Sequence, residues 1–208
     1  MSRVLSTLCV VTLVLFWLGQ QNIAGATISA ADMAPFGNLA RPTNGEHRYV
    51  SRLDMGPVSL DYYHVEGDSI GDLRSSIDQN RRHGWDAYTQ WQVYWNWPGR
   101  GLGGQCDLHK AQLITSLSLS FPQWQTPDQP NPYVASRWDH YVHGLATHER
   151  MHLENARKGF ERMRAVIAKG DCATAEAELH TIVTSMRDFD AQYDANTHHG
   201  VDQGAYFP

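Results

Sequence analysis

The chain has 208 residues, of which 42% are hydrophobic, and its 17 basic and 22 acidic residues give a formal net charge of −5. This length is sufficient for one domain with a core of its own. The acidic balance argues against nucleic acid and anionic membrane as partners.

The N-terminal residues have the pattern of an export signal. Arg3 precedes an apolar stretch that is shorter than the roughly 20 residues needed to cross a bilayer, and Ala24 and Ala26 supply small side chains for cleavage. We therefore expect residues 1–26 to be a signal peptide. After its removal we expect a periplasmic or secreted protein with no stable membrane anchor; an uncleaved anchor is the alternative. Residues 27–57, rich in Gly, Pro and Asn, are expected to be a loosely structured segment.

The first half of the remaining chain has the patterns of a small sheet. Hydrophobic periodicity predicts strands over 58–67, 88–97 and 109–124, and a short helix over 69–80. Apolar side chains alternate with polar ones in the two later strands: Trp91, Val93, Trp95 and Trp97 in one, and Leu113, Leu117, Leu119 and Phe121 in the other. Such alternation is typical of antiparallel strands with one face on the core. We expect a small antiparallel sheet.

Two long helices are predicted to follow, over about 134–168 and about 172–195, from apolar side chains that recur every three to four residues. They would form an antiparallel hairpin that turns near Gly170, with residue 148 opposite about 192. The predicted fold class is α+β, with the sheet packed on the first long helix and the second helix antiparallel to it.

Two cysteines, Cys106 and Cys172, remain once the signal with Cys9 is removed. An even number of cysteines in an exported chain predicts a disulfide. Two unpaired buried thiols are the alternative.

The first long helix contains HERMH over residues 148–152, which has the pattern H-E-x-x-H. His148 and His152 are one turn apart on the inward stripe, so both imidazoles can bind one ion. Zinc binds such nitrogens readily, and a catalytic site keeps a position for water. Glu149 then has the place of a general base acting on that water. Two core histidines beside an incidental acid are the alternative. The sequence predicts one Zn²⁺ ion.

A third protein ligand is required. Asn155 and Lys158 occupy the positions at which the metzincin pattern has glycine and histidine, which excludes that branch. Glu176 and Glu178 fit the gluzincin pattern by their count along the chain. The hairpin, however, places Glu176 roughly 18 Å along the helix from His152, too far for a ligand.

The hairpin instead returns the end of the second helix to the motif. His198 and His199 lead among the candidate ligands there because imidazole suits zinc, and Asp194 is a further candidate. Tyr193 and Tyr206 are within reach to stabilise the oxyanion of a tetrahedral intermediate, with packing as the alternative role.

Four segments, YYHVEG, GQCDLH, HERMH and YDANTHHGVDQGAYFP, together resemble a bacterial domain-of-unknown-function family described as predicted secreted zinc-dependent proteases. The resemblance covers most of residues 58–208 and implies a zincin-like fold and peptidase activity. The histidine that recurs before glycine in the last segment corresponds to His199. The resemblance thus selects His199 as the third ligand.

We expect residues 58–208 to be a zincin-like metallopeptidase domain that hydrolyses a peptide or protein substrate. The expected metal ligands are His148, His152 and His199, and the expected catalytic residues are Glu149, Tyr193 and Tyr206. Two alternatives are a non-catalytic zinc-binding periplasmic protein and a zinc amidase acting on cell-wall peptides. Intact Glu149 weighs against the first, since a structural site needs no base.

Overall fold

The computed structural model describes residues 58–100 and 105–208. The expected signal peptide, 1–26, and the segment 27–57 lie outside the described residues. The elements are β1 (Ser59–Val65), α3 (Ile70–Asn80), β2 (Tyr88–Asn96), η2 (Leu108–Lys110), β3 (Gln112–Trp124), α4 (Pro132–Lys169), α5 (Ala175–Thr197) and η3 (Val201–Gln203). Each strand and helix predicted from residue 58 onwards is present. No helix in these two ranges is long and apolar enough to cross a bilayer.

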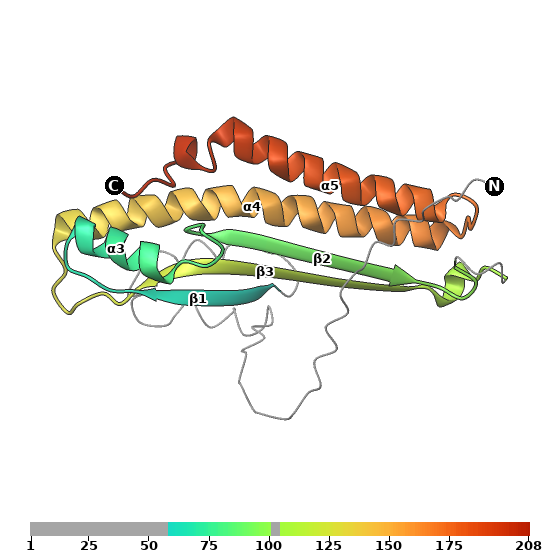
Figure 1. The fold of residues 1–208 in the computed structure, drawn as a ribbon, viewed down its shortest axis with the longest axis horizontal. Coiled ribbons are helices and arrows are strands. Elements are labelled where there is room, and N and C mark those ends of the chain that lie inside the picture. Colours follow the sequence, from blue (N-terminus) through green and yellow to red (C-terminus); the bar gives the residue numbers. More distant parts are fainter. Residues whose placement is uncertain (1–57, 101–104) are drawn as a thin grey trace, which may run out of the picture.

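The sheet has three strands in the order β1-β3-β2, with β3 in the centre (Figure 1). β2 is antiparallel to β3, with Thr89 opposite Leu119, as predicted for this pair. β1 is parallel to β3, with Leu60 beside Leu119, so the prediction of a wholly antiparallel sheet is wrong. The reason is that α3 carries the chain past the central position to the far edge. β2 forms there, and β3 returns between the two outer strands.

Helices α4 and α5 form the predicted antiparallel hairpin on one side of the sheet (Figure 1). α4 begins at Asn131, whose side chain accepts a hydrogen bond from the Tyr133 N–H, and has Pro132 in its first turn. It ends at Gly170, where φ is +76°, in the left-handed region that glycine favours.

The core has two parts along α4, with the H-E-x-x-H motif between them. The first part includes Val65, Leu119, Phe121, Trp138 and Tyr141, and the second Trp95, Trp97, Phe160, Met163 and Leu179. Among the described residues, the buried polar side chains are those of His148, Glu149 and His152, which are 5%, 4% and 9% exposed. Polar groups are costly to bury unless they are paired, so their position in the core indicates a functional site.

Two glycines let other parts of the chain approach α4 closely. A Cβ at Gly159 would lie 2.1 Å from Met186 Sδ on α5. A Cβ at Gly144 would lie 2.3 Å from the carbonyl carbon of Gly204, which belongs to the segment after α5. That segment, residues 198–208, is called the tail below. It crosses α4 at Gly144 and buries Phe207, 2% exposed, in the first part of the core.

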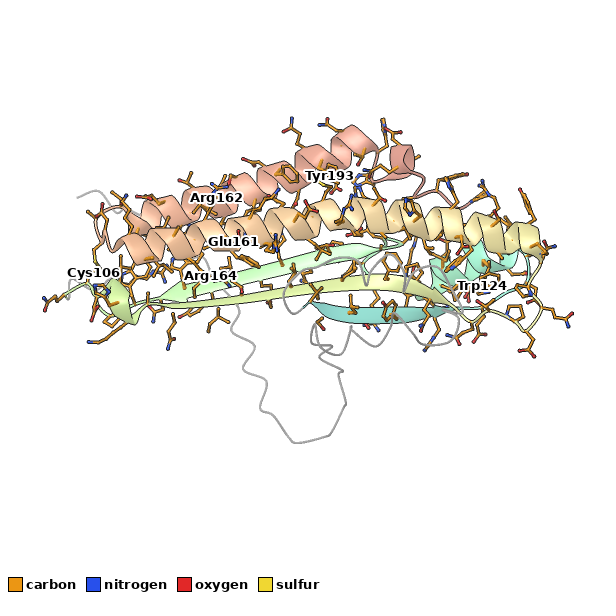
Figure 2. The ribbon with its side chains drawn as sticks, turned by 180° about the vertical axis from the view of Figure 1, so that it is seen from behind. Cys106, Trp124, Glu161, Arg162, Arg164 and Tyr193 are labelled. Atoms are coloured by element: carbon orange, nitrogen blue, oxygen red, sulfur yellow. A yellow bond between two sulfur atoms is a disulfide. The ribbon has the colours of Figure 1, made fainter. Side chains whose placement is uncertain are left out.

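A disulfide joins Cys106 to Cys172, as the sequence predicts. It connects the chain before η2 with the turn between α4 and α5, at one end of the molecule (Cys106 is labelled in Figure 2). Close to it, the Arg100 guanidinium donates from Nε and Nη2 to the two carboxylate oxygens of Glu176, at 2.7 Å each. Both contacts hold β2 and its following loop against the start of α5.

Candidate metal centre

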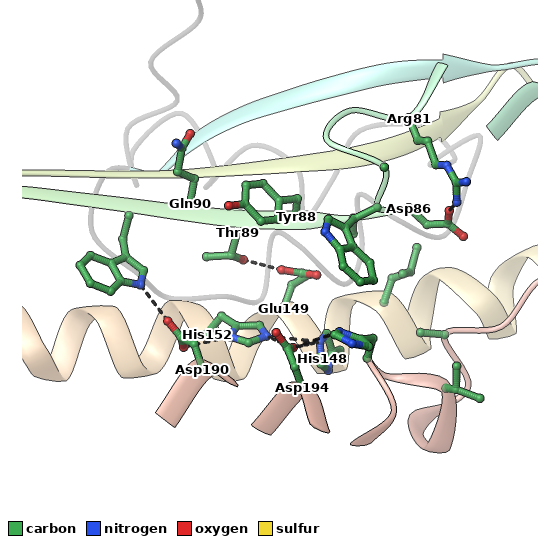
Figure 3. A pocket seen from close by; sticks show the side chains of 18 of the residues that line it. Arg81, Asp86, Tyr88, Thr89, Gln90, His148, Glu149, His152, Asp190 and Asp194 are labelled. Carbon is green, nitrogen blue, oxygen red and sulfur yellow. Dashed lines mark hydrogen bonds and ion pairs between the residues drawn. The ribbon is translucent and has the colours of Figure 1, made fainter. Parts of the chain in front are cut away.

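The three buried polar residues of α4 point from one helical stripe into the space between β2 and α5 (Figure 3). A cavity of about 630 Å³ opens over them. Its walls are formed by residues 84–91 on and before β2, by part of α5, and by the tail from His199 to Tyr206. Elements distant in the sequence thus meet at one site.

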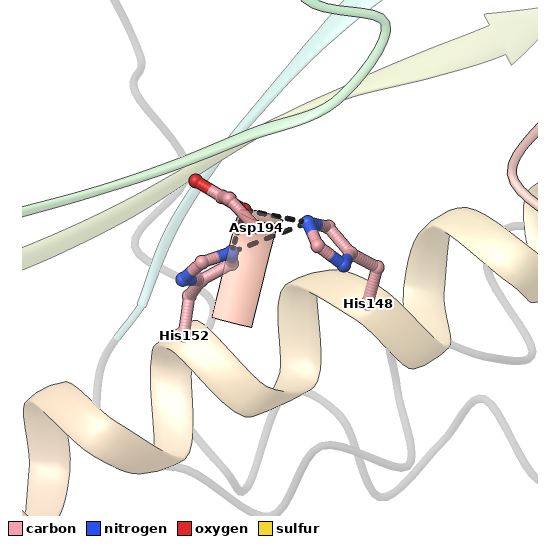
Figure 4. Close-up of side chains that lie close together, drawn as sticks. All are labelled: His148, His152 and Asp194. Atoms are coloured by element: carbon pink, nitrogen blue, oxygen red, sulfur yellow. Dashed lines mark hydrogen bonds and ion pairs between the residues drawn. The ribbon is translucent and has the colours of Figure 1, made fainter. Parts of the chain in front are cut away.

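Three ligand atoms converge at this site, two from α4 and one from α5 (Figure 4). His152 Nε2 lies 2.9 Å from Asp194 Oδ1, and His148 Nε2 lies 3.1 Å from the same oxygen. The two Nε2 atoms are 3.2 Å apart. A tetrahedral ion with bonds of about 2.1 Å separates its ligand atoms by roughly 3.4 Å. The observed distances are close to this value, so these residues fit a bound metal ion.

The other nitrogen of each imidazole is held by a second layer of side chains. His152 Nδ1 is 2.9 Å from Asp190 Oδ1, whose carboxylate also accepts a hydrogen bond of 2.8 Å from the Trp91 indole. His148 Nδ1 is 3.1 Å from Gln203 Oε1 of the tail. Acceptors at Nδ1 hold each ring in place and turn its Nε2 towards the third ligand, so that Nε2 is the nitrogen available to a metal ion.

The electrostatics of the centre favour positive charge. Burial would lower the pKa of His152, but hydrogen bonds to Asp190 and Asp194 and the charge of Glu149 raise it to about 10. Burial would raise the pKa of Asp194, but the two histidines hold it well below its usual range. Both shifts come from the carboxylates that face the two histidines, and the same negative surroundings would favour a bound divalent metal ion.

Glu149 lies beside the ligands and faces β2 (Figure 3). Its Oε2 accepts a hydrogen bond of 2.6 Å from the hydroxyl of Thr89. Burial raises the pKa of Glu149, and the Thr89 hydroxyl and the two histidines only partly oppose this. A buried carboxylate with a raised pKa, fixed by one neighbour, is suited to accept and return a proton.

His199, the third ligand expected from the sequence, lies in the cavity wall. Its Nδ1 is 3.8 Å from Asp194 Oδ1, its ring packs against Trp85 in a tilted contact with centroids 4.5 Å apart, and its side chain is 50% exposed. His198, the other tail histidine, is 74% exposed and pairs with Asp202 at 2.7 Å. The structure therefore brings Asp194, and not His199, into contact with both motif histidines. Ligation by His199 stays a prediction.

The two tyrosines proposed for catalysis lie on different sides of the centre. Tyr193 stacks on the His148 ring with centroids 5.0 Å apart, and its hydroxyl exchanges hydrogen bonds with the Gln203 amide. It packs behind His148 and is not part of the cavity wall. Tyr206 does line the cavity, with 59% of its surface exposed. Their catalytic roles stay predictions.

The two glutamates weighed as gluzincin ligands have other partners. Glu176 binds Arg100 near the disulfide, and Glu178 pairs with Lys169 at 3.2 Å. Neither belongs to the group of possible metal ligands in the described part of the chain. Both glutamates thus have partners away from the motif histidines.

Sequence reasoning does not identify Thr89, Trp91 or Gln203 as site residues; the hairpin brings Asp190 towards the motif, but its contact with His152 is not predicted. Asp190 and Asp194 are four residues apart, so they share a face of α5, and this spacing on the returning helix was an available signal. Thr89, Trp91 and Gln203 come from β2 and the tail, whose placement against α4 no local pattern reveals.

A family model described as "Bacterial protein of unknown function (DUF922)" matches residues 60–200. This range extends from β1 to the residue after His199 and contains the three converging ligands. No curated protein and no solved structure matches the chain.

Proposed function

The chain belongs to this bacterial family of unknown function, and we propose that it is a zinc-dependent metallopeptidase. The observation that carries the proposal is the convergence of His148, His152 and Asp194 at the bottom of a cavity with Glu149 beside them. Two imidazole nitrogens and a carboxylate oxygen form a donor set that suits zinc and leaves a fourth position open.

Zinc, when bound, supplies a Lewis acid that polarises a carbonyl and lowers the pKa of water. Glu149 takes the proton from the attacking water and returns it to the leaving amine. Thr89 holds the Glu149 carboxylate in place for both transfers. Tyr206 and His199, which line the cavity, are the side chains available to stabilise the oxyanion.

Strand β2 supports a peptide as the substrate. It is an edge strand, paired with β3 alone within the described residues, so its other side has free backbone groups. Thr89 and Trp91 of this strand contact Glu149 and Asp190. An extended peptide added to this edge would therefore lie across the centre. A purely structural zinc site would need neither the cavity nor the buried base.

Export from the cytoplasm is part of the proposal. The signal pattern of residues 1–26 supports it, and so does the Cys106–Cys172 disulfide, because disulfides persist in oxidising compartments.

The test separates metal binding from catalysis. We expect purified protein to hold one zinc ion per chain and to cleave an unfolded protein mixture. His148→Ala should lose the zinc. Glu149→Gln should keep it and lose activity by a factor of about 10² to 10⁴, the usual contribution of a general base.

Glu161→Gln is the matched control for the Glu149 variant. Glu161 is an exposed glutamate of the same helix, α4, and lies outside the cavity (labelled in Figure 2). It should keep both zinc and activity. Cleavage by the Glu149→Gln protein at the native rate would show that the assigned mechanism is wrong.

A further inference from the structure

The side of the cavity next to His148 carries several large apolar side chains, beside the Arg81–Asp86 ion pair. Trp85, Val201 and Tyr206 all line it, although 44%, 47% and 59% of their surfaces are exposed. Leu145, one turn before His148 on α4, belongs to the same wall. Large apolar side chains that gather in a cavity while exposed to water mark a binding site. We call Trp85, Leu145, Val201 and Tyr206 the apolar subsite.

The backbone that carries part of the apolar subsite is held in an unfavourable conformation. His198, His199 and Gly200 have φ values of +48°, +52° and +82°, three left-handed residues in a row. Such residues are costly unless they are glycine, and they persist where surrounding contacts fix them. Here the His199 ring packs against Trp85 in a tilted contact, and Val201 follows directly. The subsite is thus built by specific contacts and is not a loose surface.

The opposite side of the cavity has a free cation. Arg187 lines it from α5, two turns before Asp194, and has no hydrogen bond or ion pair with any other described residue. Arg81, the other arginine of the wall, is paired with Asp78 and Asp86. An unpaired guanidinium in a binding cavity is a ready partner for a carboxylate.

The direction of β2 relates these two sides to a peptide. Along β2, Thr89 contacts Glu149 and Trp91 contacts Asp190. The strand therefore runs away from the apolar subsite and towards Arg187. A peptide paired antiparallel to β2, the more stable arrangement, runs the other way. Its amino-terminal part then lies near Arg187 and its carboxyl-terminal part in the apolar subsite.

The spacing along α5 sets the register. Arg187 and Asp194 are seven residues apart, which corresponds to about 10 Å along the helix axis. About three residues of extended peptide span that distance. We propose that the cleft selects peptides with a large apolar residue directly after the scissile bond and an acidic residue about three positions before it. This inference rests on the proposed peptidase function and names its substrate class.

Four peptides of equal length test it. They differ only in having Leu or Ser after the intended bond and Glu or Lys three positions before it. The readouts are kcat/KM from mass spectrometry with zinc-loaded wild type, and affinity from fluorescence anisotropy with zinc-loaded Glu149→Gln protein. We expect about 30-fold preference for Leu from burial of the side chain, and about fivefold preference for Glu from a solvent-exposed ion pair.

Two variants assign each preference to its residue. Arg187→Glu should reverse the preference between Glu and Lys and leave the preference for Leu. Val201→Ser should reduce the preference for Leu and leave that for Glu. Arg164→Glu, on the exposed surface of α4 (Figure 2), and Tyr133→Ala, 67% exposed, are matched controls outside the cavity and should change neither.

The outcomes separate this inference from the proposed function. If zinc-loaded wild type cleaves neither these peptides nor an unfolded protein mixture, the peptidase function is wrong, and the anisotropy series still decides the recognition. If it cleaves and binds all four peptides equally, the recognition is wrong and the function stands. An equal effect of Arg187→Glu and Arg164→Glu would also overturn it, since general charge would then explain the preference.

Discussion

At the scale of single residues, the carboxylate of Asp190 connects the sheet to the candidate metal centre. It accepts hydrogen bonds from the Trp91 indole and the Asn155 amide and holds His152 Nδ1. We expect Asp190→Asn to weaken zinc affinity by about 10- to 100-fold, the usual effect of losing an outer-layer partner, with the fold intact. Competition with a chelator measures the affinity, and circular dichroism checks the fold. Asp188→Asn, exposed on the same helix, is the control.

The third ligand can be decided by comparing two substitutions. Asp194→Ala removes an oxygen that contacts both Nε2 atoms, so zinc affinity should fall by orders of magnitude. His199→Ala should have a smaller effect, because its nearer nitrogen is 3.8 Å from Asp194 Oδ1. Zinc titration of both proteins gives the answer. A large loss only in His199→Ala would restore the ligand set selected from the sequence.

Asp86 is a stabilising residue with a defined pH dependence. Burial would raise its pKa, but hydrogen bonds from Arg74, Tyr141 and Arg81 hold it below the usual value. Asp86→Asn removes the carboxylate that Arg74 and Arg81 share and leaves Asp78 as their remaining partner, and we expect a loss of about 1 to 3 kcal/mol in the free energy of unfolding. Denaturant unfolding at pH 7 measures it.

The sign of the pH effect follows from the lowered pKa of Asp86. The group stabilises the fold fully above its unfolded pKa, about 3.9, and this stabilisation is lost as pH falls through the lower folded value. The difference between wild type and Asp86→Asn should therefore shrink in acid. A difference that grows towards low pH would contradict this.

At the scale of elements, the approach of the tail to α4 depends on Gly144. A Cβ there would meet backbone atoms of Gly204 and Ala205, which cannot turn away as a side chain can. We expect Gly144→Ala to lower the free energy of unfolding by about 1 to 3 kcal/mol and to weaken zinc binding, because Gln203 would move off His148.

Two other glycines calibrate this expectation. Gly159→Ala meets the flexible end of Met186, so its effect should be smaller than that of Gly144→Ala. Gly71→Ala in α3 has its nearest neighbour, Ser69 Oγ, 4.0 Å away and should be neutral or slightly stabilising. Thermal unfolding and zinc titration rank all three. Equal effects of Gly71→Ala and Gly144→Ala would refute the role of the tail contact.

Local pattern predicted the elements well and their assembly less well. The stripe containing His148 and His152 and the turn at Gly170 follow from periodicity and from glycine chemistry, so the predicted ends of α4 and α5 differ from the observed ends by only one to three residues. The parallel pairing of β1 was not found, because alternation reports which face is buried and not which strand is the neighbour.

Local pattern also does not show which side chain meets both motif histidines. Preference for imidazole favoured His199, whereas the contact with Asp194 depends on helix register. The predicted hairpin has residue 192 opposite His148, whereas the structure has Asp194 in that place. The two positions differ by about half a helical turn. A shift of that size is enough to exchange one candidate for another.

At the scale of the whole molecule, the disulfide and the candidate metal centre lie at separate places along α5. Cys172 precedes the helix, and Asp194 is about 30 Å further along its axis. Opening the loop of 66 residues should lower the free energy of unfolding by up to about 4 kcal/mol on the chain-entropy model.

Zinc affinity of the folded protein should be nearly unchanged in a Cys106→Ser/Cys172→Ser variant. Chemical denaturation measures the change in the free energy of unfolding, and zinc titration at low denaturant measures the zinc affinity. A parallel loss of zinc binding under conditions where the variant is fully folded would show that the two ends are coupled.

The order of the elements fixes when the candidate centre can form during folding. The sheet and α4 are complete by residue 169, yet before α5 and the tail pack on α4, His148 and His152 lack Asp194 and the supporting Gln203. A chain at that stage of folding therefore has two of its three converging ligands. On the proposed function, such a chain is inert until its C-terminal part has folded, and chains that fold beside it are not exposed to its activity.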